Sequence, residues 1–527
     1  MIKEKISARS KAKYSQLHIV GKPNRKLLIS ITTVLALSLG VYAGIGQFSG
    51  GVDDAWGPQY SSQQQSRALL SSQVQLGDST KTGVRRWNEI AINASGLDHT
   101  PVAPGENRVF GEQLGPCRAA LAIAFVHIAI FEAVNAIDGS CQSFTGCPRA
   151  STGTSMDAAI AQAAHDTLVE LFPSQKASFD QLLAEDLNRI THPGKSKGIL
   201  LGKVAAKSIM FPRNSDGRKH PEPLVNIDFI TSDLPGIWRQ DPISLIPLAL
   251  GAHWGDVKPL VLRSASQFRT PPPPALNSPE YAAAFNEAKQ LGGDGVVTPT
   301  ARTEDQTQIG IFWAYDGTPS LCAPPRLYNQ IAIQIAEQMG TNTVELARLL
   351  ALVNVAMADA GIAIWESKYF YQFWRPITGI READEGTGPT GAGDGNPATA
   401  GDVNFFPLGA PASNLTGPNF TPPFPAYPSG HAGFGGALFQ TLRRFYGTDN
   451  IPFTFVSDEF NGVTVDNGGN VRPLIPRSFS SLSQAEEENG QSRIYLGIHW
   501  SFDKTEGIAQ GRRVADYVFK SAVLRKR

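Results

Sequence analysis

The sequence predicts a mostly α-helical protein built of helix bundles. Apolar residues recur at intervals of three and four in several long stretches, the spacing that places them on one face of an amphipathic helix. Residues 118–137 form an almost unbroken apolar run, as expected for a helix at the centre of a bundle. Long connections rich in proline and glycine, notably 268–278 and 385–425, separate the helical stretches and predict functional loops, such as pocket walls or an oligomer contact.

The expected helices follow one another along most of the chain. His127 lies within the first and is predicted to be a packed core histidine rather than a ligand. The helices are expected at 118–137, 158–172, 175–190, 197–210, 279–291, 327–339, 344–365 and 432–446.

The N-terminal segment has the pattern of a targeting sequence. Residues 1–26 are basic and polar, an apolar run follows at 27–45, and Val41-Tyr42-Ala43 fits a signal-peptidase site after Ala43. We therefore expect a signal peptide at 1–46 and an exported protein, periplasmic or extracellular. Because the run is nearly long enough to span a bilayer, an uncleaved anchor with membrane contact is the alternative. Residues 47–83, rich in Ser, Gln and Gly, predict a linker or extended arm.

Charge and cysteine content set limits on partners and compartment. Lys and Arg total 47, as do Asp and Glu, so the net charge is zero and offers no electrostatic basis for binding nucleic acid. The four cysteines lack zinc-type spacing, and their even number suits an oxidising compartment. Cys141 and Cys147 flank a short polar loop that a disulfide could close, whereas Cys117 and Cys322 could be free or paired.

Three consecutive residues before the last expected helix combine groups that bind an oxyanion. Ser429 offers a hydroxyl, Gly430 a sterically free backbone amide and His431 an imidazole. We expect them at a helix N-terminus, where unpaired N–H groups and the helix dipole favour an anion. A plain turn before a capped helix is the alternative for so short a motif.

Two further stretches add cations and a second histidine. Lys368 and Arg375 are seven residues apart, two turns of a helix and therefore one face, and the proline after Arg375 is expected to end that helix. Downstream, Arg493 precedes His499 by six residues. Asp503 stands four residues after His499, the spacing at which a carboxylate can hydrogen-bond an imidazole. A solvated face and a core histidine are the alternatives.

The surroundings of these cations favour a binding site. Lys368, Arg375 and Arg493 stand among aromatic and aliphatic residues, and burying three cations without a counter-charge would be very costly. An anion is therefore expected among them. With the Ser429 hydroxyl and the Gly430 amide they predict a cage for a tetrahedral or trigonal-bipyramidal oxyanion, with the two histidines at its axial positions.

The order Lys-x6-Arg-Pro, Pro-Ser-Gly-His and Ser-Arg-x5-His-x3-Asp resembles the tripartite signature of vanadium-dependent haloperoxidases and type 2 phosphatidic acid phosphatases. The triple occupies the C-terminal third. Weaker likeness to the bacterial, chloroperoxidase-like haloperoxidase branch begins at 86–91 and 118–123, so the resemblance covers most of the chain beyond the expected arm. It implies two packed four-helix bundles, an N-terminal one at 84–300 and a vanadate-binding one at 301–527, with the active site in the second.

The resemblance also implies roles for the motif residues. Vanadate would be the cofactor, and His499 would supply the single bond from the protein to vanadium. His431 would lie near the opposite, apical oxygen and act as acid and base when peroxide binds. The equatorial oxygens would receive hydrogen bonds from Lys368, Arg375, Ser429, Gly430 and Arg493, of which Lys368 would also be catalytic.

Four residues beside the cage are assigned by the same resemblance. Asp503 would orient His499, and Asp305, by its context, would be the carboxylate that pairs with Arg493. Trp365 and Phe424 stand where the halide-side aromatic residues of the chloroperoxidase-like branch are expected. The algal bromoperoxidase branch is expected to carry a histidine at the Phe424 position, which argues against specificity for bromide alone.

The aromatic stretch at 369–374 is expected to form a narrow apolar mouth, unsuited to a large phosphate ester. Core packing is the alternative for this stretch.

The implied reaction is the oxidation of a halide (bromide, and also chloride or iodide) by hydrogen peroxide to hypohalous acid, which halogenates small organic substrates. An acid phosphatase, in which His499 attacks a phosphate ester and His431 protonates the leaving alcohol, remains an alternative. A second is an exported oxyanion-binding or structural protein without turnover, although two axial histidines argue against it. A homo-oligomer is also expected.

Overall fold

A computed structural model of the protein describes residues 55–62, 81–523, 525 and 526. All of them belong to one compact unit that spans Gly46–Arg527. The expected signal peptide or anchor at 1–46 lies outside the described residues, and the expected linker or arm at 47–83 is described only in part. The boundary near residue 300 between two bundles stays a prediction.

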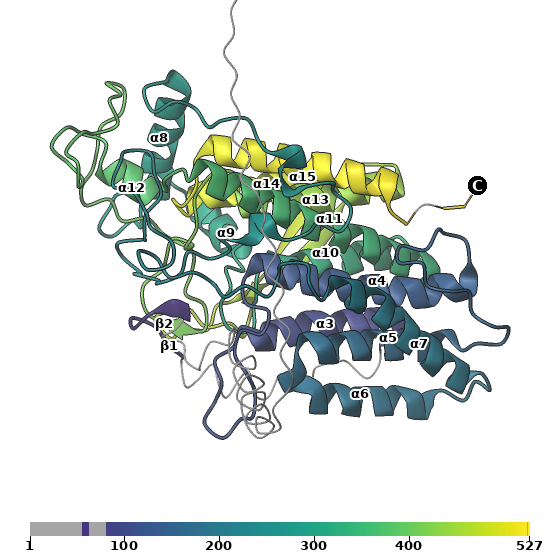
Figure 1. The fold of residues 1–527 in the computed structure, drawn as a ribbon. Coiled ribbons are helices and arrows are strands. Elements are labelled where there is room, and N and C mark those ends of the chain that lie inside the picture. Colours follow the sequence, from purple (N-terminus) through teal and green to yellow (C-terminus); the bar gives the residue numbers. More distant parts are fainter. Residues whose placement is uncertain (1–54, 63–80, 524, 527) are drawn as a thin grey trace, which may run out of the picture. The chain divides into compact units, whose positions relative to one another are not determined.

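The N-terminal helices pack around α4 (Pro116–Asp138), whose buried side chains lie on all its faces. Its neighbours are α3 (Gly83–Asp98), α5 (Met156–Leu171) and α7 (Lys195–Met210), while α6 (Lys176–Arg189) lies beyond α5 (Figure 1). Short 3₁₀ turns lie at Pro173–Gln175, Phe211–Arg213, Trp254–Asp256 and Ala265–Phe268.

The C-terminal helices pack around α11 (Thr343–Tyr371), which also contacts α4 and so joins the two groups of helices. The tightest packing is between α13 (Gly430–Tyr446) and α15 (Ser501–Ser521), where a Cβ at Gly511 would overlap the backbone oxygen of Gly433. This close approach explains why glycines face each other across the two helices. Around them lie α8 (Pro279–Gly292), α9 (Glu304–Phe312), α10 (Pro324–Gln338), α12 (Pro376–Arg381) and α14 (Leu482–Tyr495) (Figure 1).

Two small antiparallel ladders complete the described fold. The strand β1 (Ser61–Ser62) pairs with β2 (Leu415–Thr416), with Ser61 opposite Thr416. The strand β3 (Phe453–Asn461) pairs with β4 (Leu474–Phe479) and is irregular after Val456. The first ladder ties the N-terminal arm to the long loop that precedes α13 (Figure 1).

The prediction of a mostly helical fold is confirmed. Each expected helix is present, with its ends shifted by a few residues. The helix that was expected to end at residue 365 continues to Tyr371. The helices α3, α9, α12, α14 and α15 and the β-ladders were not predicted. In α14 the reason is its sequence, because a run of three glutamates leaves no clean apolar face.

Two helices of the described residues, α4 and α11, are long and apolar enough to cross a membrane, but their most apolar stretches are 94% and 100% buried inside the molecule. Both are therefore core helices of this fold. The four cysteines are buried free thiols, so the disulfide considered between Cys141 and Cys147 is not formed.

Candidate active site

The N-terminus of α13 carries the serine, glycine and first histidine of the motif, as predicted. Ser429 is the N-cap, and its hydroxyl accepts a hydrogen bond from the Ala432 amide at 3.4 Å. Gly430 and His431 begin the helix. A Cβ at Gly430 would lie only 3.1 Å from the Trp365 ring, so glycine lets this ring close over the helix end.

Lys368 and Arg375 reach the same place from two different helices, which corrects the prediction of one continuous helical face. The helix α11 ends at Tyr371, because Gln372 adopts a left-handed conformation with φ of 49°. Arg375 is the N-cap of α12, and Pro376 begins this helix instead of ending the previous one. The two cations converge through the turn between the helices.

Backbone carbonyls hold both cations. Lys368 Nζ donates to the carbonyls of Pro425 and Ala426 at 2.7 and 2.9 Å. Arg375 donates through Nε to the Phe424 carbonyl at 2.9 Å and through Nη1 to the Ile498 carbonyl at 2.8 Å. The loop before α13 therefore fixes where both positive charges lie.

Arg493, on α14, is fully buried and pairs with Asp316, a carboxylate that was not predicted from the sequence. Its Nη2 donates to Asp316 Oδ1 at 2.7 Å, while its Nε and Nη1 are buried and have no hydrogen-bond partner among the described residues. A buried guanidinium with two free donors is costly unless an acceptor meets it. These donors fit an oxyanion.

The pairing expected between Asp305 and Arg493 is not found. Asp305 lies in the first turn of α9, its side chain is 67% exposed, and it pairs with Arg477 at 2.8 Å. The partner of Arg493 is Asp316, just beyond the end of α9. Asp316 stands among Trp313, Ala314 and Tyr315, and a carboxylate in so apolar a stretch was the signal that could have identified it.

His499 and Asp503 form the predicted carboxylate–imidazole pair. His499 Nδ1 donates to Asp503 Oδ2 at 2.8 Å, which places the lone pair of the ring on Nε2. Arg375 Nη1 donates to this nitrogen at 2.9 Å. Nε2 is thus the atom of His499 that faces the cations and is able to bond to a metal centre.

His431 is held by the loop after α9. Its Nε2 hydrogen-bonds the Ala314 carbonyl, which requires the ring proton on Nε2, and Asp316 Oδ1 lies 3.9 Å away. Burial, followed by the charge of Arg493, lowers the pKa of His431 well below its usual value. The ring is therefore neutral at neutral pH.

Burial and mutual repulsion depress the basicity of the other cage groups as well. Burial and then the charge of Arg375 lower the pKa of Lys368 and the pKa of His499 well below their usual values. Burial lowers the pKa of Arg375 to about 9. An oxyanion placed among these groups would oppose each of these shifts, so binding of an anion and retention of protons favour each other.

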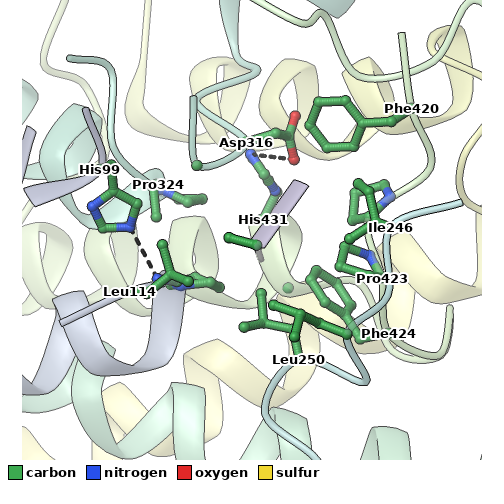
Figure 2. A pocket seen from close by; sticks show the side chains of 18 of the residues that line it. His99, Leu114, Ile246, Leu250, Asp316, Pro324, Phe420, Pro423, Phe424 and His431 are labelled. Carbon is green, nitrogen blue, oxygen red and sulfur yellow. Dashed lines mark hydrogen bonds and ion pairs between the residues drawn. The ribbon is translucent and has the colours of Figure 1, made fainter. Parts of the chain in front are cut away.

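A pocket opens over this cluster, and His431, Arg493, His499 and Asp316 line its polar side. Figure 2 shows His431 and Asp316 facing a ring of apolar side chains. The apolar lining includes Leu114, Ile246, Leu248, Leu250, Phe420 and Phe424.

Trp365 and Phe424 lie beside the cage, where the sequence placed them. Their rings are 4.9 Å apart, and both line the pocket. Lys368 Nζ lies 5.6 and 5.1 Å from the centroids of Trp365 and Phe424, so the rings cover the cation and shield it from water.

The aromatic stretch at 369–374 does not form the pocket mouth. Phe370 is 57% exposed, and Phe373 and Trp374 pack in a separate core with Tyr281. The mouth was misassigned because α11 ends at Tyr371, after which the chain turns away. Its walls come from the loop at 246–250, from Phe420 and from the N-terminal arm.

The residues present therefore fit a tetrahedral or five-coordinate oxyanion such as vanadate. One buried cluster contains all the groups that such an anion needs. They are the two free donors of Arg493, the N-terminus of α13, the ammonium of Lys368 and Nε2 of His499. No group of three or more His, Cys, Asp or Glu side chains able to hold a metal cation occurs among the described residues. The donor set of the cage is that of an anion site.

Comparison with known proteins relates the C-terminal part of the chain to a described domain. Residues 348–525 match the family model described as the VCPO second helical-bundle domain. Vanadium chloroperoxidase from Curvularia inaequalis is 42% identical over 269 residues, which cover 44% of this chain and 42% of that protein. The chain thus matches less than half the length of this curated relative.

Solved structures share the fold over most of the chain. The first bacterial vanadium-dependent iodoperoxidase superposes with a TM-score of 0.65 at 24% identity, covering 84% of this chain and 97% of that one. A bacterial vanadium-dependent chloroperoxidase in its apo form gives a TM-score of 0.58 at 18% identity, covering 77% of this chain and 94% of that one. The helical architecture described above is the one these haloperoxidases have.

Proposed function

We propose that this chain is a vanadium-dependent haloperoxidase, which oxidises a halide with hydrogen peroxide. The observation that carries the proposal is the buried cluster of Lys368, Arg375 and Arg493 around Nε2 of His499, with two donors of Arg493 left for an anion. The match of residues 348–525 to the VCPO domain and the 42% identity to vanadium chloroperoxidase support it.

The overall reaction consumes H2O2, one halide ion and one proton, and forms HOX and water. Bound vanadate supplies the electrophilic activation of the peroxide. The side chains and backbone of the protein bind and orient the vanadate and move the protons. The charges of Arg493, Arg375 and Lys368 would neutralise the oxyanion, and these side chains and the Gly430 amide would orient it. His499 would anchor it through Nε2, while Asp503 keeps the ring proton of His499 on Nδ1.

His431 is assigned the proton transfers. Its ring is neutral and lies beside the Arg493–Asp316 pair, and with the proton on Nε2 it would accept a proton from an incoming peroxide at Nδ1 and return it to the departing oxygen. Trp365 and Phe424 exclude water on the side where a weakly hydrated halide would approach. Bromide is the expected halide, with chloride or iodide as further substrates.

Acid phosphatase activity is the second candidate, since a transferring phosphoryl group has the same five-coordinate shape. The apolar pocket above the cage makes it the weaker one, because a charged phosphate ester gains little from such walls. Export from the cytoplasm and a homo-oligomeric state are further parts of the proposal.

One experiment on purified protein tests the proposal. Vanadium content and bromination of monochlorodimedone are measured on the same sample, before and after reconstitution with vanadate. We expect vanadate uptake, halogenation that rises in proportion to it, and competition by excess phosphate for the same cage. Phosphate ester hydrolysis without halogenation would favour the second candidate, and vanadate uptake indifferent to phosphate would contradict the shared site.

A further inference from the structure

The N-terminal arm forms part of the pocket wall, although it lies more than 300 residues before the cage in the sequence. Ala55 and Trp56 line the pocket together with Phe420. The Trp56 side chain is largely buried, at 6% exposure. Its ring meets the Phe420 ring edge to face, with centroids 5.0 Å apart and planes at 79°. An aromatic corner therefore stands beside the catalytic cluster.

The arm is held in this position by several specific contacts. The Tyr60 hydroxyl donates to the Pro418 carbonyl at 3.0 Å, and Gln59 Nε2 donates to the Ile243 carbonyl at 3.0 Å. The β1–β2 ladder adds Ser61 opposite Thr416. Gly417, with φ of 120°, makes room for the arm, since a Cβ there would lie 2.7 Å from the Tyr60 ring. The arm is thus built into the wall of the pocket.

Trp56 reaches toward the polar side of the pocket as well. A Cβ at Gly317 would lie 3.9 Å from Cζ2 of Trp56, so the indole lies against the backbone of the residue that follows Asp316. The indole Nε1–H is buried and has no acceptor among the described residues. A water molecule or a polar atom of a bound ligand would satisfy it.

Resting on the haloperoxidase function above, we propose that this pocket binds a small aromatic acceptor against Trp56 and Phe420, and that halogenation takes place on the bound acceptor. The mostly apolar lining suits an aromatic molecule. Aromatic rings gain affinity from edge-to-face packing beyond the burial of their area. Trp56 would then determine which acceptor is used.

The chemical step balances without any further reactant. The electrophilic halogen of HOX bonds to a ring carbon of the acceptor, the ring loses a proton from that carbon, and hydroxide leaves HOX to form water with this proton. HOX formed beside His431 meets the bound ring before it diffuses away, so selectivity comes from the pocket instead of from solution reactivity.

Competition between two acceptors distinguishes halogenation of a pocket-bound acceptor from halogenation by free HOX in solution. We would supply 2-naphthol and 4-hydroxybenzoate together, with bromide and peroxide, and compare the product ratio with that produced by added hypobromous acid. The wild-type ratio should favour 2-naphthol about tenfold over the reagent ratio. Trp56→Ala should return it to within about twofold of the reagent, with Trp56→Phe in between. A wild-type ratio equal to that of the reagent would overturn the proposal.

A binding measurement keeps this test separate from the haloperoxidase function. Calorimetric titration of 2-naphthol into vanadate-free protein should give a dissociation constant that Trp56→Ala raises about tenfold. Val296→Ala, at an exposed position outside the pocket lining, is the control and should bind as the wild type does. Trp56→Phe retains an aromatic partner for Phe420 and serves if the alanine variant does not fold. Equal affinity in all variants would refute the site, whereas binding without halide oxidation would refute only the function.

Discussion

At the residue scale, the pair of Arg493 and Asp316 sets much of the charge in the candidate site. Asp316 accepts from Nη2 alone, which orients the guanidinium and leaves Nε and Nη1 for an anion. Burial raises the pKa of Asp316, and the adjacent Arg493 opposes that rise. Asp316 and the buried Asp503 thus offset part of the charge of the three clustered cations, and the two free donors of Arg493 favour an oxyanion over a neutral ligand.

Asp316→Asn should weaken both the fold and the cage. It leaves the buried charge of Arg493 without a counter-ion, a change that costs about 3–5 kcal/mol when one partner of a buried pair is removed. Urea unfolding and vanadate affinity measure the two effects. Asp305→Asn is the matched control, because this exposed carboxylate should change the free energy of unfolding by less than about 0.5 kcal/mol. Equal losses in both variants would contradict the pairing seen here.

The two histidines should be separable by mutation. His499→Ala removes Nε2 from the cage, so halide oxidation and retention of vanadate should both be lost. His431→Ala should retain most of the vanadate and lose about 100- to 10,000-fold in activity, the usual contribution of a general acid–base group. Vanadium content, halogenation rate and thermal melts of both variants are the readouts. If vanadium is equal in the two and activity merely follows the melts, both residues are packing residues only.

At the scale of elements, the contact between α13 and α15 holds groups of the candidate site together. Glycines at 433 and 511 let the two helices approach closely. The amide of Ser429 donates to the Asp503 backbone oxygen at 3.0 Å, which links the N-terminus of α13 to the first turn of α15. The helix that carries His431 and the carboxylate that orients His499 therefore move as one body.

Gly511→Ala should disrupt this contact. The added methyl group would meet the backbone oxygen of Gly433, which cannot turn away as a side chain can. We expect a loss of about 1–3 kcal/mol in the free energy of unfolding and reduced halogenation per bound vanadium. Arg513→Ala, at an exposed position of the same helix, is the control and should change neither. A Gly511→Ala protein that melts like the wild type would show that the helices can separate freely.

At the scale of the whole molecule, one pocket collects residues from nearly the full described length, from Ala55 to His499. The core helices α4 and α11 contact each other, which places the N-terminus of α4 beside the cage. His99, on the N-terminal side, accepts from the Gly115 amide at 2.9 Å and fixes this helix end at the pocket wall (Figure 2). Stability of the N-terminal helices is thus a condition for the site.

His127 should make that stability depend on pH. It is buried in α4 and bonded to Asn88 Oδ1 at 2.9 Å, as expected of a core histidine. Burial lowers its pKa from 6.5 to about 3. The folded state therefore disfavours protonation of His127. The contribution of neutral His127 to the free energy of unfolding is complete above pH 6.5 and is lost as the pH falls toward 3.

Melting curves of the wild type and His127→Gln between neutral and acid pH test this dependence. The wild type should lose up to about 1.4 kcal/mol per pH unit from this one group, and the variant should follow a shallower slope. Parallel slopes would mean that His127 takes up its proton without opposing the fold.

Processing of the N-terminus is a further prediction for the whole chain. Because a basic segment, an apolar run and Val41-Tyr42-Ala43 follow one another, the mature protein should begin near Gly44 and lie outside the cytoplasm. N-terminal sequencing of fractionated cells checks this expectation. An intact Met1 in the soluble cytoplasmic fraction would contradict it.

The sequence by itself predicted the helical fold class and the members of the cage. Periodicity of three and four depends only on residues that are neighbours along the chain. The spacing of His499 and Asp503 is equally local, because His499 lies just before α15 and Asp503 lies in its first turn. Ser429, Gly430 and His431 were assignable to a helix N-terminus for the same local reason. In each case the information is carried by residues a few positions apart.

Only the tertiary structure decided what lies around that cage. Three features depend on contacts between distant segments of the chain. The partner of Arg493 is Asp316 instead of Asp305, the helix ends between Lys368 and Arg375, and Trp56 lies in the pocket wall. Such contacts leave no periodic signal, because they are set by how helices pack and where loops return. The sequence therefore specified the chemistry of the site, and packing specified its counter-charge and its walls.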